Sequence, residues 1–473
     1  MKRWILLGLF FVVLLAPLVV SAWLGREVKV KSADLELVII TPHQEAIRRE
    51  FAEAFTRYYR ETFGKTVAID YRTFGASDIV KYFDERAKTV SKENPTYGID
   101  IAWGGGDFLF DVQLKKPGYL QALKLPAELM KEVFPDAKLS GLPLYDVDPK
   151  NGPCWFGTAL SSFGVVYNRD VLRHLGVPEP RTWRDLADPR LANWVVLADP
   201  TRSASAKQAY MVIVERAMAD ALARGQSENV GWADGMGLIR QIAANARLFT
   251  DSSSVVPIMV SQGEAAAGMA IDFYGRSQAN AVGNERMGYV EPANATIINP
   301  DPIALVTGAP HRELAQQFIE FVLSRQGQVL WNLKPGVAGG PRADALRRLP
   351  IRRDVYADMT NFTDQVNPFE AASSFNKSNA REKTFGIMGE LIQFSCIDLL
   401  DELREMRKVI LASPQAKELD ARLGQFPFEE PEALKRLDAW KKATPSARLA
   451  LAREWTEQFR AEYGELRTMA GAR

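Results

Sequence analysis

Strands and helices alternate along the chain from Asp34 to Trp331, and this alternation limits the fold more than any other feature of the sequence. The first strand is expected at "DLELVIITP", and "HQEAIRREFAEAFTRYYRETFG" then repeats its apolar residues at helical spacing. The same succession returns at "NWVVLADPTRSASAKQAYMVIVERAM" and at "PDPIALVTGAPHRELAQQFIEFVLSRQGQVLW". The pattern predicts an α/β fold with mostly parallel sheets covered by helices.

The length and the local composition divide the chain further. A chain of 473 residues is too long for one hydrophobic core, so two or three domains are expected. The segment "KPGVAGGPRADALRRLP" is rich in Gly, Pro and Arg, which is typical of a linker or a surface strap. From Asn376 onward the apolar residues recur at helical spacing almost without a break, so a helical C-terminal extension is expected.

The N-terminus has the composition of an export signal. Lys2 and Arg3 precede an apolar run from Trp4 to Val20, and the small residues Ser21 and Ala22 offer a cleavage site. The run is long for a signal peptide and short for a membrane-spanning helix, so residues 1–22 are either a signal peptide or an uncleaved anchor. In both cases the rest of the chain is expected to work outside the cytoplasm, in the periplasm or the extracellular space.

The charge balance and the missing motifs exclude several function classes. Lys and Arg total 59 against 58 Asp and Glu, which does not favour a nucleic-acid partner. The sequence has no Walker phosphate loop, no HExxH and no GxSxG, and three histidines are too few for a histidine-rich metal site. An enzyme is therefore not expected. The alternative that stays open is a hydrolase that uses His43 with Ser77 or Asp272.

Polar side chains and glycines gather where the predicted strands end. Ligands of open α/β sheets bind outside the carboxyl ends of the strands, so these positions are candidates for one cleft. Hydroxyl groups at helix starts can also cap the helix or cradle an anion. Together with the strand residue Thr158, the candidate ligand-binding residues are Thr41, His43, Ser77, Gly105, Gly106, Thr158, Ser203, Ser205, Asp272, Tyr274 and Arg276.

The stretch "GMAIDFYGR" ends on three polar residues at alternate positions. If the strand stays regular through Arg276, then Asp272, Tyr274 and Arg276 lie on one side of it. An acid, a phenol and a guanidinium on one face predict a three-residue ligand surface. The two cysteines, Cys154 and Cys396, either form a disulfide across a long loop or are separate small buried residues.

The segment "SSFGVVYNRDVLRHLGVPEPRTWRDLADPRLANWVVLADPTRSASA" resembles the central part of bacterial extracellular solute-binding proteins, the substrate receptors of ABC importers. The stretches "GEAAAGMAIDFYGR" and "ELAQQFIEFVLSRQGQVLW" agree with this resemblance, which covers about Leu35 to Trp331. It implies the two-lobed type II periplasmic-binding-protein-like fold, in which two α/β lobes joined by hinge strands close over one ligand.

This resemblance implies a domain plan and a partner. The expected parts are a first portion of lobe 1 at 34–157, lobe 2 at 158–275, a return to lobe 1 at 276–333, a linker at 334–375 and the helical extension at 376–473. The expected partners are a small-molecule or metal-ion ligand and an importer permease in the membrane. A membrane-tethered sensor with the same fold is the alternative.

The resemblance is to the subgroup that holds receptors for ferric iron, thiamine, phosphonates and sugar phosphates, so it leaves two kinds of ligand open. No cofactor is required, but Fe³⁺ is a candidate ligand, with His43, Asp272 and Tyr274 as the implied metal ligands. Ferric receptors often carry two adjacent tyrosines where this chain has Phe273 and Tyr274. The other candidate is an organic anion, whose phosphate or carboxylate Arg276 would bind as a fork.

Overall fold

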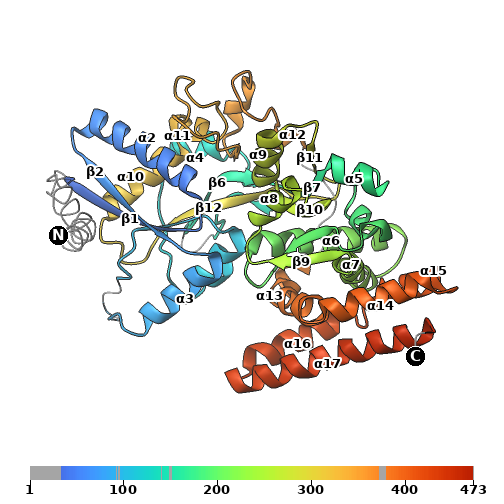
Figure 1. Cartoon of the computed structure of the whole chain (residues 1–473). Helices are drawn as coiled ribbons and strands as arrows, with labels where there is room; N and C mark the ends of the chain where they lie inside the picture. Colours follow the sequence, from blue (N-terminus) through green and yellow to red (C-terminus); the bar gives the residue numbers. More distant parts are fainter. Residues whose placement is uncertain are drawn as a thin grey trace, which may run out of the picture.

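Two sheets organise the chain into two lobes that lie side by side (Figure 1). The computed structural model describes residues 33–91, 93, 96–139, 141–148, 152–371 and 380–471. The predicted signal or anchor at residues 1–22 lies outside this range. Among the described residues, no helix has both the length and the apolar character needed to cross a membrane.

Lobe 1 is built on a six-stranded sheet with the order β13-β6-β12-β3-β1-β2. The strands β1, β2 and β3 are parallel, whereas β12 runs antiparallel to its neighbours β3 and β6. The strands of this sheet are β1 (Leu35–Thr41), β2 (Val67–Thr73), β3 (Ile101–Trp103), β6 (Phe156–Ser161), β12 (Asn299–Leu305) and β13 (Leu349–Pro350). Around it lie the helices α2 (Glu45–Phe63), α3 (Ala76–Ala87), η1 (Leu109–Leu114), α4 (Ala127–Val133), α10 (Arg312–Leu323) and α11 (Arg325–Val329).

Lobe 2 is built on a five-stranded sheet with the order β11-β7-β10-β8-β9. Here β8 is parallel to β9 and β10, and β7 is antiparallel to β10 and β11. The strands are β7 (Phe163–Asn168), β8 (Val195–Ala198), β9 (Ala246–Thr250), β10 (Ala267–Ile271) and β11 (Met287–Val290). The helices are α5 (Arg169–Leu175), α6 (Ala204–Ala223), α7 (Glu228–Ala243), α8 (Val255–Ser261) and α9 (Asp272–Val282).

Between β6 and β12 the described chain crosses between the lobes at two places, and both differ from the predicted boundaries. The first crossing lies between β6 and β7, at Ser162, so residues 158–161 belong to lobe 1. The second lies between the end of β11 at Val290 and the start of β12 at Asn299, so residues 276–290 belong to lobe 2. The predicted return at residue 276 was wrong because β11 pairs with β7 and completes the second sheet.

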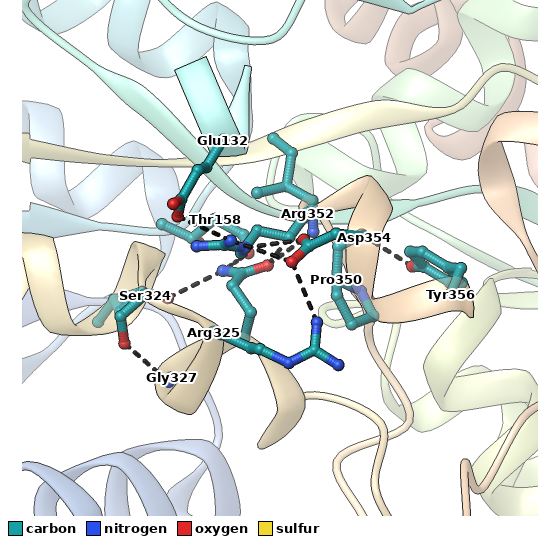
Figure 2. Close-up of polar contacts among 12 residues, drawn as sticks. Glu132, Thr158, Ser324, Arg325, Gly327, Pro350, Arg352, Asp354 and Tyr356 are labelled. Atoms are coloured by element: carbon teal, nitrogen blue, oxygen red, sulfur yellow. Dashed lines mark hydrogen bonds and ion pairs between the residues drawn. The ribbon is translucent and has the colours of Figure 1, made fainter. Parts of the chain in front are cut away.

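The segment predicted as a linker or a surface strap is a strap on lobe 1, defined here as residues 334–371. Its strand β13 pairs with β6. Arg352 donates to Asp354 and Glu132, Arg325 of α11 also donates to Asp354, and the Tyr356 hydroxyl donates to the Pro350 carbonyl (Figure 2). Backbone pairing and side-chain contacts thus fix the described part of this segment in place, which a linker would not show.

Five helices follow residue 380 and pack beneath lobe 2 (Figure 1), as the apolar periodicity predicts. We call α13 (Ala380–Ile392), α14 (Leu400–Ala412), α15 (Ala416–Leu423), α16 (Glu430–Lys442) and α17 (Pro445–Met469) the C-terminal helices. They share one hydrophobic core with α6 and α7. Within it the fully buried Arg240 of α7 forms an ion pair with Glu462 at 2.8 Å and donates to the carbonyls of Leu423 and Gln425. The C-terminal helices are therefore part of the core of lobe 2.

The structure decides between the two alternatives for the cysteines. Cys154 lies in lobe 1, Cys396 lies in the short helix η5 (Gln393–Ile397) between α13 and α14, and both are free and buried. Burial raises the pKa of each thiol to about 11, so both are protonated at neutral pH. The two residues are separate small buried side chains, and the disulfide alternative is wrong.

Candidate functional site

A cavity of about 630 Å³ lies between the lobes and is lined by both of them. Lobe 1 supplies the turns that follow β1, β2 and β3, and lobe 2 supplies the N-terminal end of α6, residues 251–253 and the start of α9. Most of these segments follow the carboxyl end of a strand, where ligands of α/β sheets bind. Of the predicted candidates, the cleft brings together His43, Ser77, Gly105, Gly106, Ser203, Ser205 and Tyr274.

Asp301 of β12 is the polar centre of the lobe 1 wall. Its carboxylate accepts hydrogen bonds from the backbone amides of Gly105 at 2.9 Å and Gly106 at 3.3 Å. It also contacts His43 Nε2 at 2.9 Å and Arg348 Nη1 at 2.9 Å. Burial alone would raise the pKa of Asp301, but the charge of Arg348 and the hydrogen bond with His43 hold it well below its usual range. Asp301 is therefore a buried, ionised hub.

The three glycines after β3 are explained by this hub. Gly104, Gly105 and Gly106 all have a positive φ, between +87° and +108°, which side chains rarely adopt. A Cβ atom at Gly104 would also lie 2.7 Å from the His43 ring. The glycines thus let the backbone turn its amides toward Asp301 while His43 packs against the turn.

His43 lines the cleft as a neutral side chain. It is 6% exposed and packs edge-on against Trp103, with ring centroids 4.7 Å apart. Burial lowers its pKa, and this effect outweighs the neighbouring Asp301. No hydrogen bond joins His43 to Ser77 or Asp272 among the described residues, so the pairs that the hydrolase alternative needs are not formed.

Arg348 is the arginine on the lobe 1 side of the cleft, and it comes from the strap. It donates to Ser161 Oγ at 3.0 Å, and its guanidinium carbon lies 4.5 Å from the ring centroid of Phe273 and 5.5 Å from that of Trp331. The residue is 3% exposed. No local pattern in the sequence marks Arg348 as a site residue, because only the long-range pairing of β13 with β6 brings it to the cleft.

The lobe 2 wall carries a chain of hydroxyl groups at the start of α6. Ser203 caps the helix by accepting from the Ala206 amide at 3.2 Å. Ser203 Oγ lies 3.1 Å from Ser205 Oγ, which lies 2.7 Å from Ser253 Oγ. The positive end of a 20-residue helix and three hydroxyl groups therefore face the cleft, and Lys207 follows on the same helix.

Three cleft residues have a buried polar atom with no partner in the part of the chain that the structure describes. These atoms are His43 Nδ1, Gln208 Nε2 and Arg348 Nε. Buried polar groups in proteins nearly always have a hydrogen-bond partner. All three residues belong to the wall of this cavity, so part of its polar lining has unused hydrogen-bonding capacity.

The strand that contains Met269 and Ala270 ends earlier than predicted. β10 stops at Ile271 and α9 begins at Asp272, so Asp272, Tyr274 and Arg276 do not alternate along a strand. On a helix Asp272 and Arg276, four positions apart, share one face, whereas Tyr274, two positions from each, points the other way. Tyr274 lines the cleft, whereas Asp272 and Arg276 do not. The predicted three-residue ligand face was therefore wrong.

Asp272 and Arg276 form a buried pair behind the cleft. Arg276 Nη1 lies 3.5 Å from Asp272 Oδ2, and Arg276 also pairs with Glu291. Thr41 and Thr158 are likewise behind the cleft wall: Thr41 Oγ1 accepts from the His43 amide, and Thr158 Oγ1 donates to the Asp301 carbonyl. These four candidates support the residues around them and do not line the cavity.

The proposed metal ligands are not assembled into a site. His43 Nε2 is engaged by Asp301, and Asp272 does not line the cavity. Burial raises the pKa of Tyr274 to about 12, which disfavours the phenolate that a ferric ion requires. Among the described residues, no group of three or more His, Cys, Asp and Glu side chains is placed to hold a metal ion.

Asp272→Asn is expected to change how stability depends on pH. Burial raises the pKa of Asp272 to about 7, so between pH 4 and pH 7 the folded protein holds a proton that the unfolded chain releases. Wild-type stability therefore falls as the pH rises through this window. The variant lacks this term, so the difference in free energy of unfolding, variant minus wild type, should increase with pH by up to about 1.4 kcal/mol per unit.

Urea unfolding at pH 5 and pH 8 measures this difference. The exposed Asp401→Asn serves as the control, since its side chain is 93% exposed and a pH effect should be small. An equal change for both variants between the two pH values would contradict the assignment of a protonated Asp272.

Comparison with known proteins agrees with the two-lobed architecture. The family described as bacterial extracellular solute-binding protein matches residues 113–350. The chain is 25% identical over 199 residues to the phosphoglycerate transport regulatory protein PgtC of Salmonella typhimurium, covering 40% of this chain and 46% of the relative. It is 27% identical over 183 residues to iron uptake protein A1 of Synechocystis, covering 37% and 46%. The matches thus span just under half the length of these relatives.

A solved structure shows the same fold over most of the described chain. The periplasmic binding protein AfuA of Actinobacillus pleuropneumoniae, solved with fructose 6-phosphate bound, aligns with a TM-score of 0.52 and 18% identity. The alignment covers 79% of this chain and 97% of AfuA. This likeness confirms the two-lobed periplasmic-binding fold, and the family match extends over half of the sequence. The chain belongs to the family of bacterial extracellular solute-binding proteins.

Proposed function

We propose that this protein is the substrate-binding component of an ABC importer and that it captures a small organic anion, a phosphorylated or carboxylated compound, between its lobes. Family membership and the two-lobed fold support the receptor role. The cavity has residues of both lobes in its wall, so one ligand can contact both and stabilise their closure. The permease in the membrane would recognise the closed form.

The proposal of an anionic ligand rests mainly on one lysine in the cleft that has no carboxylate partner among the described residues. Three of the four Lys and Arg side chains in the lining have a carboxylate partner: Lys81 with Asp78, Arg202 with Asp251, and Arg348 with Asp301. Lys207, the fourth, has no acidic partner among the described residues. A half-buried ammonium group without a counterion favours an anionic ligand.

The surroundings of Lys207 fit an anionic group. The N-terminal end of α6 carries a partial positive charge, and Ser203, Ser205 and Ser253 supply hydroxyl donors beside it. Arg348 across the cleft and Gln208, next to Lys207 on α6, each have a buried N–H group without a partner in the described structure. Such donors suit phosphate or carboxylate oxygens and the hydroxyl groups of a small carbon skeleton.

A thermal-shift and calorimetric screen tests this proposal. The probes are 3-phosphoglycerate, fructose 6-phosphate, inorganic phosphate and ferric citrate. We expect at least one organic phosphate to raise the melting temperature, because a ligand that binds only the folded state stabilises it. If ferric citrate alone does so, and a visible charge-transfer band appears, the ligand is iron and not an organic anion. If no probe does so, the anionic ligand class is wrong.

Lys207→Gln is expected to weaken binding of the organic phosphate by about 10- to 100-fold, the usual range for losing one charge-assisted hydrogen bond. Titration calorimetry of the full chain measures the dissociation constant. Lys408→Gln is the matched control, since Lys408 is 80% exposed on α14 and does not line the cleft. Equal affinity of the two variants for the organic phosphate would show that Lys207 does not take part in binding.

Export is proposed from the N-terminal segment and the family. Sequencing the N-terminus of the mature protein from whole cells that express it natively separates the two alternatives. A start near Trp23 indicates a cleaved signal and a periplasmic or extracellular receptor. An intact Met1 indicates an anchored protein and favours the membrane-tethered sensor.

A further inference from the structure

The first of the C-terminal helices reaches the ligand cleft. The C-terminal helices share their core with lobe 2, yet Phe385 of α13 lines the cavity between the lobes. Its ring centroid lies 4.5 Å from that of Phe108, which precedes η1 in lobe 1. A side chain anchored on lobe 2 thus contacts the opposite lobe at the edge of the cleft.

The same helix supports the unneutralised lysine. Lys207 Nζ lies 5.6 Å from the ring centroid of Phe385, a distance that allows a cation–π interaction. One turn further along α13, a Cβ atom at Gly389 would lie 3.1 Å from Lys207 Cε and 3.4 Å from the Pro200 carbonyl. α13 therefore packs closely against the turn that begins α6 and limits where Lys207 can lie.

Neighbouring contacts hold Phe385 in this position. Trp232 of α7 donates through Nε1 to Thr384 Oγ1 at 3.2 Å, and both side chains are fully buried. Phe385 itself is 4% exposed. Because Thr384 is fixed to lobe 2, its neighbour Phe385 presents the ring to the cleft as a rigid surface.

We propose that α13 is part of the ligand site. Phe385 forms the apolar wall for the carbon skeleton of the solute, positions Lys207 for its anionic group, and through Phe108 connects the C-terminal helices to lobe 1. The ligand part of this inference rests on the proposed function. The connection between the lobes rests on geometry alone.

The test compares full-length Phe385→Ala with Phe394→Ala. Phe394 follows α13, is also 4% exposed, and packs on Trp440 and Trp455, away from the cleft. Both variants create a cavity in the same hydrophobic core, so both should lower the melting temperature. Only Phe385→Ala is expected to weaken binding of the organic phosphate that the wild type binds, by about tenfold.

Hydrogen exchange of the ligand-free proteins provides a second readout. Phe385→Ala, but not Phe394→Ala, should speed amide exchange in residues 107–114 of lobe 1, because it removes the Phe108 contact. Equal affinity and equal exchange for the two variants would overturn the inference. If no probe binds the wild type, the anionic ligand class fails, and exchange at 107–114 alone decides: faster exchange supports the connection, and unchanged exchange overturns it.

Discussion

Asp301→Asn is expected to lower the free energy of unfolding by about 3–5 kcal/mol, the usual cost of removing one partner from a buried ion pair. The substitution leaves the guanidinium of Arg348, which is 3% exposed, without its carboxylate at 2.9 Å. It also weakens the hydrogen bonds that Asp301 accepts from the Gly105 and Gly106 amides. The glycine turn and Arg348 both depend on this one charge.

Urea unfolding at neutral pH, compared with Asp438→Asn, measures the effect. Asp438 forms an exposed pair with Lys442 on α16, with side chains 63% and 74% exposed, so its loss should cost at most about 0.5 kcal/mol. The pKa of Asp301 is lower in the folded protein, so its stabilising effect is present above the unfolded pKa and lost as the pH falls below it. The difference between wild type and Asp301→Asn should therefore shrink in acid. If Asp301→Asn lowers the free energy of unfolding by less than about 1 kcal/mol at neutral pH, Asp301 is not the buried, ionised hub described above.

Gly237→Ala is expected to destabilise the protein by about 3 kcal/mol or more, which is the upper end of the usual destabilisation by overpacking a core. A Cβ atom at Gly237 of α7 would overlap the backbone carbonyl of Gly424, just after α15. Backbone atoms on both sides leave no flexible side chain to give way. The missing side chain is what allows the C-terminal helices to pack on lobe 2.

Gly464→Ala is the matched control, and its expected change in stability has the opposite sign. Gly464 is also inside a helix, α17, but nothing lies within 4 Å of an added Cβ atom. Here alanine should stabilise by about 0.5–1 kcal/mol, because glycine is the poorer helix former. Denaturant midpoints of both variants give the comparison. If both shift in the same direction, the close approach of α7 to Gly424 is not real.

Strand–helix alternation predicted the α/β character of both lobes, because strands with covering helices leave a local pattern of apolar residues. The expectation of mostly parallel sheets was wrong: β12 and β7 run antiparallel to both of their neighbours, so both sheets are mixed. The placement of His43, Ser77 and Ser203 at one cleft also followed from the sequence, since the carboxyl ends of such strands meet at one edge. The lobe boundaries did not follow. Whether residues after α9 join the second sheet depends on the pairing of β11 with β7, which is a long-range contact.

The errors at the end of β10 have a similar cause. "DFYGR" reads equally as a strand end or as a helix start, and short segments of this kind are ambiguous from periodicity alone. In the structure the helix α9 turns Asp272 and Arg276 into a buried pair and leaves Tyr274 in the cleft. Alternation of polar residues was not enough to identify a ligand face.

By itself the sequence determined the α/β character, the helical C-terminal region and the family, because these depend on local periodicity and on contiguous motifs. Only the tertiary structure decided which distant side chains join His43, Ser77 and Ser203 in the cleft. Arg348 arrives through the pairing of β13 with β6, and Phe385 arrives through the packing of α13 on α6 and α7. Both residues are more than 70 positions along the chain from the nearest predicted candidate, Arg276. Only the burial of apolar surfaces from distant parts of the chain brings them to the cleft.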